Sequence, residues 1–136
     1  MPLDPASITL AEAAQAMLET PSDSVRFQVF FEFMRGADDA DLSALPLIES
    51  EPQRTGDLRF DALLAATADL IALRLGEFCP AWANARYRFL TAPWCITDLP
   101  SCRIYAMAYS PEPFRRHGIF IDRRDLTSDG RRWKDY

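Results

Sequence analysis

The segment from Leu58 to Leu75 constrains the fold most, because it is the longest apolar helical pattern in the chain. Asp57 can cap its start, and Gly76 and Pro80 punctuate its end. Its apolar positions recur at helical spacing, with one face formed by Phe60, Leu64, Ala68, Ile71 and Leu75 and flanked by Leu63, Leu70 and Leu73. We therefore expect this segment to be the central helix of the fold.

Two helical patterns precede the central segment. Thr9 and Glu12 form a capping-box pattern, which predicts a helix over residues 9–20 that Pro21 stops. A second helix is expected to begin at one of the three polar residues after Pro21 and to end at Gly36. Its wide apolar arc, rich in phenylalanine, indicates contact with more than one neighbouring element.

The connections around these helices carry turn and loop signals. Residues 38–50 predict a short helical turn broken by Pro46, and residues 50–56 have the polar composition of a linker. Residues 80–100 are aromatic but too unevenly spaced for a long helix or a regular strand, so we expect a packed loop. The proline at the end of this loop suits the first turn of a further helix, which runs to about Tyr109.

The stretch that begins at Ser110 is expected to close the fold. Ser110 can cap a short helix that starts with Pro111, and Gly118 ends this helix in left-handed geometry. Residues 119–121 predict a brief extended segment, and Asp122 can cap a last short helix.

Length and composition favour one domain. The chain has 136 residues, 49% of them hydrophobic, which is enough for a single core. The sequence predicts a mainly α fold, a compact single-domain helical bundle with a short extended segment near the C-terminus. Within residues 1–136 we expect a helical N-terminal part (7–50), a linker (50–56), a central helix with the C-terminal part (57–126), and a tail that frays (127–136).

Charge is distributed unevenly along the chain. Residues 1–57 hold 11 acidic and 3 basic side chains, a net charge of −8, whereas residues 58–136 hold 9 acidic and 12 basic side chains, a net charge of +3. Two such halves can attract each other or present opposite faces to different partners. The overall net charge of −5 argues against a dedicated DNA-binding surface.

Nothing in the sequence predicts a membrane protein or a disulfide framework. No apolar run approaches the ~18 residues of a membrane span, and the amino end lacks the pattern of a signal peptide. Cys79, Cys95 and Cys102 are an odd number without paired spacing. We expect free thiols and a cytoplasmic protein.

Motifs for metal binding or catalysis are weak. A zinc site could draw only on Cys79, Cys95, Cys102 and His117, which lack a Cys-x-x-Cys pair, so we expect no metal and no cofactor. A cysteine or serine nucleophile with His117 as base can be drawn, but no catalytic motif accompanies it. A small hydrolase or transferase using His117 is therefore the alternative, and the expected role of His117 is to bond the last carbonyls of its short helix.

Four arginines are the candidate partner-binding residues of the C-terminal part. Arg115, Arg116, Arg123 and Arg124 suit bidentate contact with carboxylates or phosphates. They can form a solvated face that pairs with nearby aspartates and with the acidic half of the chain, bind an acidic protein surface, or bind nucleic acid. Direct binding of nucleic acid is not expected from the negative total charge.

Trp82 and Trp94 are the candidate aromatic anchors. They lie in the expected packed loop and belong to the residue types enriched at binding hot spots. Packing in the core is the alternative, because irregular segments in small domains are usually pinned by such side chains. Their exposure distinguishes the two interpretations.

The order of motifs between residues 55 and 126 resembles a group of poorly characterised bacterial proteins. The shared features are a Thr-Gly-Asp start to a long helix, Pro80-Ala81-Trp82, Pro93-Trp94, and the run from Pro113 to Phe120. Some members carry an amino-terminal helix-turn-helix of the Xre type and look like antitoxins or regulators from toxin–antitoxin loci. Residues 1–54 show no recognition helix, so the resemblance implies a partner-binding module and not a DNA reader.

The sequence therefore predicts a non-catalytic protein-interaction module, antitoxin-like or an accessory protein of a bacterial toxin–antitoxin-type system. A hydrolase or transferase using His117 is the alternative, and a nucleic-acid-binding regulator is the third. A protein partner is expected, whereas the oligomeric state stays open.

Overall fold

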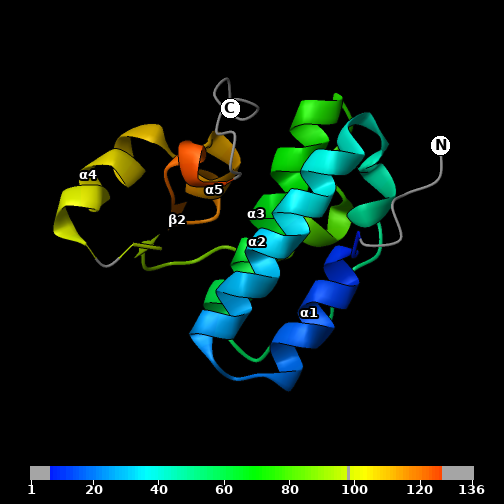
Figure 1. Cartoon of the computed structure of the whole chain (residues 1–136), viewed down its shortest axis with the longest axis horizontal. Coiled ribbons are helices and arrows are strands. Elements are labelled where there is room, and N and C mark those ends of the chain that lie inside the picture. The colour runs from blue at the N-terminus through cyan, green and yellow to red at the C-terminus, as the bar shows by residue number, and fades with distance from the viewer. Residues whose placement is uncertain (1–6, 98, 127–136) are drawn as a thin grey trace.

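A computed structural model describes residues 7–97 and 99–126. The expectation that residues 127–136 fray lies outside the described residues. Three helices, α1 (Leu10–Glu19), α2 (Asp23–Ala40) and α3 (Leu58–Leu75), form the main body of the molecule. Figure 1 shows α2 in front of α3 and α1 beside them, with α4 (Pro100–Tyr109) lying apart from this body. The prediction of a mainly α, compact fold is confirmed.

Helix α1 begins as the sequence predicts. The Thr9 hydroxyl accepts a hydrogen bond from the Glu12 amide, and the Glu12 carboxylate accepts one from the Thr9 amide, each at 3.1 Å. These two bonds satisfy amides that the first turn of a helix leaves without partners. Leu10, Ala13 and Met17 then face the core.

Helix α2 is longer than expected. The prediction that it ends at Gly36 is wrong, because the helix continues to Ala40. Gly36 lies inside the helix where Ser7 approaches closely: a Cβ at this position would be 3.4 Å from the Ser7 Cα. The glycine therefore marks a close contact between two segments and not a helix end.

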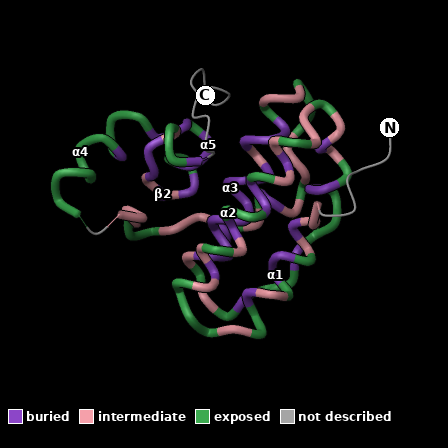
Figure 2. The backbone as a smooth tube through the Cα atoms, in the orientation of Figure 1, coloured by how far each residue is buried: buried purple, intermediate pink, exposed green. Residues whose placement is uncertain are grey.

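Helix α3 is the centre of the core. Asp57 caps it by accepting a hydrogen bond from the Arg59 amide at 2.9 Å, and Gly76 follows its last turn. Twelve of its eighteen residues are buried, including Phe60, Leu64 and Ile71. Figure 2 shows this burial along the helix. Leu73, placed on the flank of the apolar face from the sequence, is exposed.

The segment between α2 and α3 is held firmly against the body. It contains two 3₁₀ turns, η1 (Asp41–Ser43) and η2 (Leu45–Leu47), and Pro46 lies in the first turn of η2. Residues 50–56, which have a linker's composition, include the buried Pro52 and Thr55. The Thr55 amide donates to the buried Asp61 carboxylate at 2.7 Å. This connection is therefore part of the packed structure.

The expected packed loop contains short regular pieces. Two 3₁₀ turns, η3 (Ala81–Asn84) and η4 (Arg86–Arg88), are followed by the strand β1 (Trp94–Cys95). It pairs in parallel with β2 (Ile119–Phe120), with Trp94 opposite Ile119 and Cys95 opposite Phe120. The predicted extended segment near the C-terminus is thus present, and its pairing partner comes from the loop.

The C-terminal part continues with α5 (Glu112–Arg116) and the 3₁₀ turn η5 (Arg123–Asp125), which Asp122 caps as predicted. The expectation that Ser110 caps α5 is wrong. Its hydroxyl donates to the Ala106 carbonyl at 2.6 Å and accepts from the Ile121 amide at 2.8 Å. Ser110 thus joins the end of α4 to the strand segment.

Gly118 lies where only a glycine fits. Its φ of +84° is in the left-handed region, as the sequence predicts, and an added Cβ would lie 2.9 Å from the Leu90 Cβ. The Gly118 carbonyl accepts from the Trp94 amide at 2.9 Å. Backbone conformation and close packing both require glycine here.

Candidate functional site

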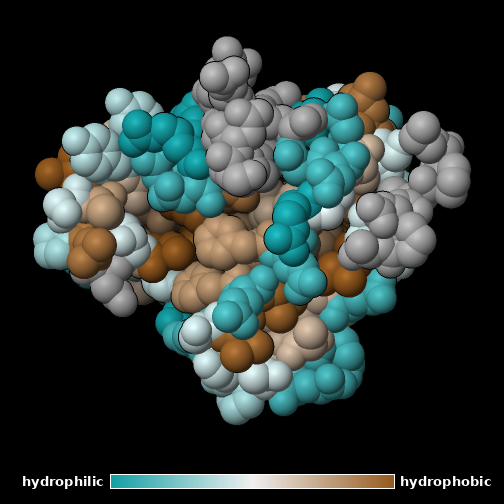
Figure 3. Space-filling model, viewed as in Figure 1, coloured by the Kyte–Doolittle hydropathy of each residue, from teal (hydrophilic) through white to brown (hydrophobic). Residues whose placement is uncertain are grey.

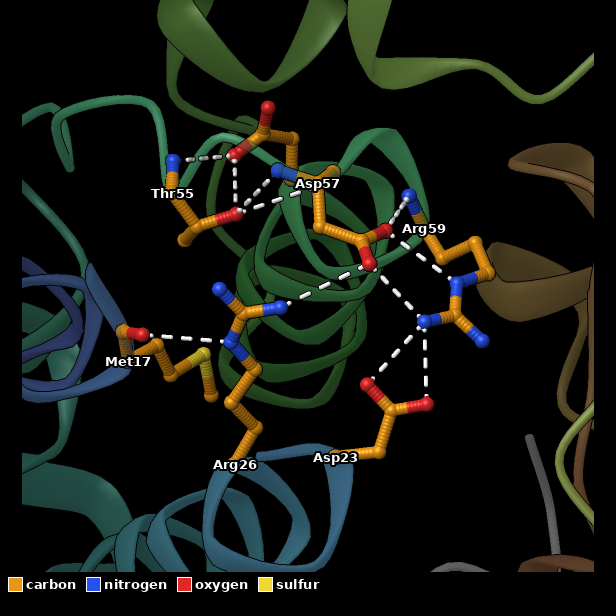
Figure 4. Close-up of polar contacts among 7 residues, drawn as sticks. Met17, Asp23, Arg26, Thr55, Asp57 and Arg59 are labelled. Atoms are coloured by element: carbon orange, nitrogen blue, oxygen red, sulfur yellow. Dashed lines mark hydrogen bonds and ion pairs between the residues drawn. The ribbon is translucent and has the colours of Figure 1, made fainter. Parts of the chain in front are cut away.

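A polar network surrounds the start of α3 (Figure 4). The Arg59 guanidinium bonds the carboxylates of Asp57 and Asp23, and Arg26 donates to the Met17 carbonyl at 3.1 Å and to Asp57 at 3.5 Å. The hydrogen bonds from Arg59 lower the pKa of Asp57. Because these groups satisfy one another, the network joins α1, α2 and α3 and offers no evident binding group.

Trp82 contributes to the packing of a buried arginine. Its ring lies over the Arg88 guanidinium, 4.8 Å from ring centroid to Cζ, and its indole N–H donates to the Ile48 carbonyl at 3.1 Å. Arg88 has no exposed surface and donates to the carbonyls of Asp61 and Pro52 at 3.0 and 2.8 Å. Trp82, predicted as a partner-binding anchor, is half-buried in these internal contacts.

Trp94 is also half-buried against the main body. Its ring contacts Phe60 edge-on with centroids 5.4 Å apart, and Phe27 at 5.9 Å. The Arg59 guanidinium lies 5.1 Å from the ring centroid. The internal contacts of both tryptophans match the core-packing interpretation of their loop.

His117 is enclosed by the fold. Its side chain has no exposed surface, its ring stacks on Phe89 with centroids 4.1 Å apart, and Nδ1 lies 2.7 Å from the Arg88 carbonyl oxygen. Burial lowers its pKa, although the Arg88 carbonyl and Asp69 oppose this effect. The expectation that His117 bonds the last carbonyls of its own helix is confirmed for its backbone amide, which donates to the Phe114 and Pro113 carbonyls at 3.1 and 3.3 Å. Its ring instead reaches a carbonyl 29 residues away.

The enclosure of His117 is unfavourable for catalysis. A neutral histidine that donates from Nδ1 keeps a lone pair on Nε2, which lies 3.8 Å from an Asp69 carboxylate oxygen and has no hydrogen-bond partner. A general base must come within hydrogen-bond reach of its substrate. A side chain with no exposed surface offers a substrate no such approach.

The Cys79 thiol is unsuited to nucleophilic attack near neutral pH. Burial and the neighbouring Asp69 raise the pKa of Cys79 to about 11, so its thiol stays protonated near neutral pH, and the thiolate is the nucleophile. Cys95 is half-buried and Cys102 is exposed, and all three are free thiols. Among the described residues no three His, Cys, Asp or Glu side chains gather into a group that could hold a metal ion.

The four predicted partner-binding arginines are at or near the surface, but each has a partner within the chain. Arg115 and Arg123 donate to the carbonyls of Ser110 and Tyr109, at 3.0 and 2.8 Å. Arg124 binds the Asp122 carboxylate and its guanidinium lies over the Tyr109 ring, whereas Arg116 reaches Asp69 on α3 at 2.6 Å. Three of the four therefore brace the junction of α4 with the segment that follows it.

Helix α4 differs from every other long helix in its exposure. Of its ten residues, all of which the structure describes, Ala106 alone is buried. Large apolar side chains are open to solvent on and beside it, and we call them the α4 face: Leu99, Ile104, Tyr105, Met107 and Tyr109. Ile104 is 71% exposed and Met107 is 60% exposed. The helix carries a single charged residue, Arg103.

Two hollows adjoin α4. One, of about 340 Å³, lies between α4, α2 and the C-terminal segment and is lined by Phe31, Ile96, Tyr105 and Ile121 among others; we call it the α4 hollow. The second, of about 800 Å³, runs along α2 and is bounded by Asp125 and Leu126; we call it the α2 groove. Phe31 and Asp125 line both hollows. Figure 3 shows apolar side chains gathered in the depression between α4 and α2.

The sequence predicted α4 but not its exposure. Periodicity places apolar residues on a helix, and it does not reveal whether a neighbour covers them. The sequence of α4 does contain one relevant signal. Apolar residues occur all round the helix with one charged residue among them, a pattern typical of a helix that neighbours cover. The candidate site is therefore the α4 face with its adjoining hollows.

None of the helices that the structure describes is long and apolar enough to cross a membrane. Comparisons with protein-family models, with curated proteins and with solved structures found no match for this chain.

Proposed function

We propose that this protein binds another protein through the α4 face and has no catalytic activity of its own. The observation that carries the proposal is a helix that is apolar all round and has one buried residue out of ten. A group of exposed large apolar side chains of this kind marks an interaction site. A partner that covers α4 would remove Ile104 and Met107 from water.

The composition of the α4 face agrees with a binding surface. Methionine and tyrosine are enriched in the centres of protein interfaces, and lysine and glutamate are depleted there. Met107, Tyr105 and Tyr109 are exposed on α4, which has no lysine or glutamate. Arg124 lies over Tyr109, with 4.7 Å between Cζ and the ring centroid, and adds a charged edge to this surface.

The more specific role is proposed from the sequence resemblance. In this proposal the protein is cytoplasmic and antitoxin-like, or an accessory protein of a bacterial toxin–antitoxin-type system, and its partner is the cognate protein of that system. The four arginines and the two tryptophans stay predicted partner-binding residues. No specific observation favours the hydrolase or the nucleic-acid-binding alternative.

The test compares the wild-type chain with a double charge variant of α4 and a single charge variant elsewhere on the surface. Ile104→Glu with Met107→Glu places two carboxylates on the α4 face, and Phe78→Glu places one at an apolar residue that is 97% exposed on another part of the molecule. Each tagged protein is purified from the cells that make it naturally. We expect the wild type and the Phe78 variant to recover the same protein in stoichiometric amount, and the α4 variant to lose it.

Thermal unfolding monitored by circular dichroism is the control for folding. All three proteins should melt within a few degrees of one another, because the substituted side chains are exposed. Recovery of no stoichiometric protein by the wild type, or full recovery by the α4 variant, would contradict the proposal.

A further inference from the structure

The α2 groove follows one face of α2 along most of its length. Its lining residues on this helix recur at intervals of three and four: Ser24, Phe27, Gln28, Phe31, Glu32, Arg35, Asp38 and Asp39. A helix of this length is about 27 Å long at ~1.5 Å per residue. Two phenylalanines one helical turn apart, Phe27 and Phe31, line the groove together with Leu126.

The charged groups of the groove are mainly acidic. Glu32, Asp38, Asp39 and Asp125 line it, and Arg35 is the basic residue among its lining side chains. Glu32 and Asp39 are exposed on α2. Burial and the neighbouring Asp122 raise the pKa of Asp125, and the nearby Arg124 opposes this effect.

We infer that the α2 groove binds a basic amphipathic helix of the partner. The inference rests on the proposed function, because the groove shares Phe31 and Asp125 with the hollow beneath α4. Leucine-type side chains of such a helix would pack on Phe27 and Phe31, and its lysines or arginines would lie over Glu32 and Asp39. This is the recognition mode in which an amphipathic helix lies in a groove with apolar positions at helical spacing.

Charge complementarity decides between a basic and an acidic occupant. An acidic helix would bring carboxylates against the four acidic side chains of the groove, and such like-charge contacts suppress binding. A basic helix would gain long-range attraction from the same side chains. The groove therefore selects the sign of its partner's charge, and the α4 face supplies apolar area.

The test uses two synthetic 18-residue probes in place of the unidentified partner. One is an amphipathic helix of leucine and lysine, and the other has the same pattern with glutamate for lysine. Binding to the full-length chain is measured by fluorescence anisotropy of a label on the probe. We expect the lysine probe to bind at least about tenfold more tightly than the glutamate probe, and to bind more weakly as salt is raised.

Two charge-reversal variants locate the binding. Glu32→Lys with Asp39→Lys reverses the exposed carboxylates of the groove, and we expect it to weaken lysine-probe binding by about tenfold or more. The matched control, Glu49→Lys with Glu51→Lys, makes the same charge change at two exposed residues that line a different hollow. We expect the control to stay within about threefold of wild type, because Glu49 and Glu51 do not line the α2 groove and exposed charges are screened by salt.

The neutral variant Glu32→Gln with Asp39→Asn guards against unfolding of the reversed one. It should melt like the wild type. Its binding of the lysine probe should be weaker than that of the wild type and tighter than that of the charge-reversed variant. Equal losses in the groove variant and the control would overturn the inference, because binding would then follow net charge alone.

The Ile104→Glu/Met107→Glu variant separates this inference from the proposed function. If the lysine probe depends on the α4 face but not on Glu32 and Asp39, the proposed function stands and the groove assignment fails. If the probe depends on neither surface, the groove assignment fails, and the recovery of the natural partner by the α4 variant decides the proposed function.

Other occupants of the groove give recognisable results. A concentration-dependent dimer in light scattering that the Glu32→Lys/Asp39→Lys variant abolishes would assign the groove to a second copy of the chain. Tighter probe binding by an Arg131→Glu/Arg132→Glu variant would assign it to the chain's own C-terminal residues. Either result would overturn the assignment to a partner helix.

Discussion

Helices α3 and α4 are both predominantly apolar, yet one is the most buried helix of the molecule and the other is the most exposed. Neighbours cover α3 from several sides, and twelve of its eighteen residues are buried. One residue of the ten in α4 is buried, although the helix has a single charged side chain. The comparison teaches that an apolar helix indicates that neighbours are required, and that the described residues cover α3 but leave α4 exposed.

The largest expected effect concerns the buried side of this comparison. Leu64→Ala should lower the free energy of unfolding by ~2–5 kcal/mol, because Leu64 is buried and its truncation leaves a cavity. Urea unfolding at equilibrium measures the change. A loss below ~1 kcal/mol would mean that the site collapses around the smaller side chain or that α3 is less enclosed than described.

A substitution at Gly118 tests the turn between α5 and β2. Gly118→Ala should cost more than ~1 kcal/mol, because it adds strain at positive φ and brings its Cβ to 2.9 Å from the Leu90 Cβ. Gly56→Ala is the matched control: its φ is +88°, but an added Cβ would meet nothing within 4 Å. The difference between the two melts isolates the steric part, and equal losses would show that strain in φ alone matters.

The buried His117 makes the free energy of unfolding depend on pH. Its pKa is lowered by burial in the folded state, so the unfolded chain takes up a proton near pH ~6.5 before the folded chain does. The stability from the neutral ring is complete above this pH and falls as the pH drops toward the folded pKa. Urea unfolding between pH 8 and pH 5 should show this loss, and His117→Asn should reduce the slope; an unchanged slope would assign it to other groups.

Arg59 tests the polar cap of the buried helix. Arg59→Ala removes the ion pairs to Asp57 and Asp23 and its contact with the Trp94 ring. Because the Arg59 side chain is partly exposed, we expect a loss of ~0.5–1 kcal/mol. Added salt should reduce the difference between variant and wild type, and a difference insensitive to salt would point to lost packing.

The smallest effect is expected on the exposed side of the comparison. Ile104→Ala and Met107→Ala should each change the free energy of unfolding of the isolated chain by ~0.5 kcal/mol or less, because both side chains are exposed. A loss comparable to that of Leu64→Ala would break the comparison, since it would mean that α4 is covered in the isolated chain.

Local signals in the sequence predicted the start and end of most elements. The capping box of α1, the cap of α3 at Asp57 and the positive φ of Gly118 depend on residues a few positions apart, so the sequence reveals them directly. The continuation of α2 through Gly36 was missed, because the reason for the glycine is Ser7, which approaches from another segment.

The features that decide the candidate site depend on distant parts of the chain. Arg88 is buried because it meets carbonyls 27 and 36 residues away, and His117 because it meets one 29 residues away. The exposure of α4 is of the same kind, since it depends on where the other described elements lie. Helical periodicity contains no information about such contacts.

The hydrogen bonds of the Ser110 hydroxyl allow a change in α4 to be measured at a buried backbone amide. The hydroxyl donates to the Ala106 carbonyl and accepts from the Ile121 amide, so a change at the end of α4 that moves Ser110 alters the hydrogen bond of this amide. The exchange rate of the Ile121 amide proton with deuterated solvent reports how often that bond opens. A single NMR resonance can therefore register occupancy of the α4 face without a label on the face itself.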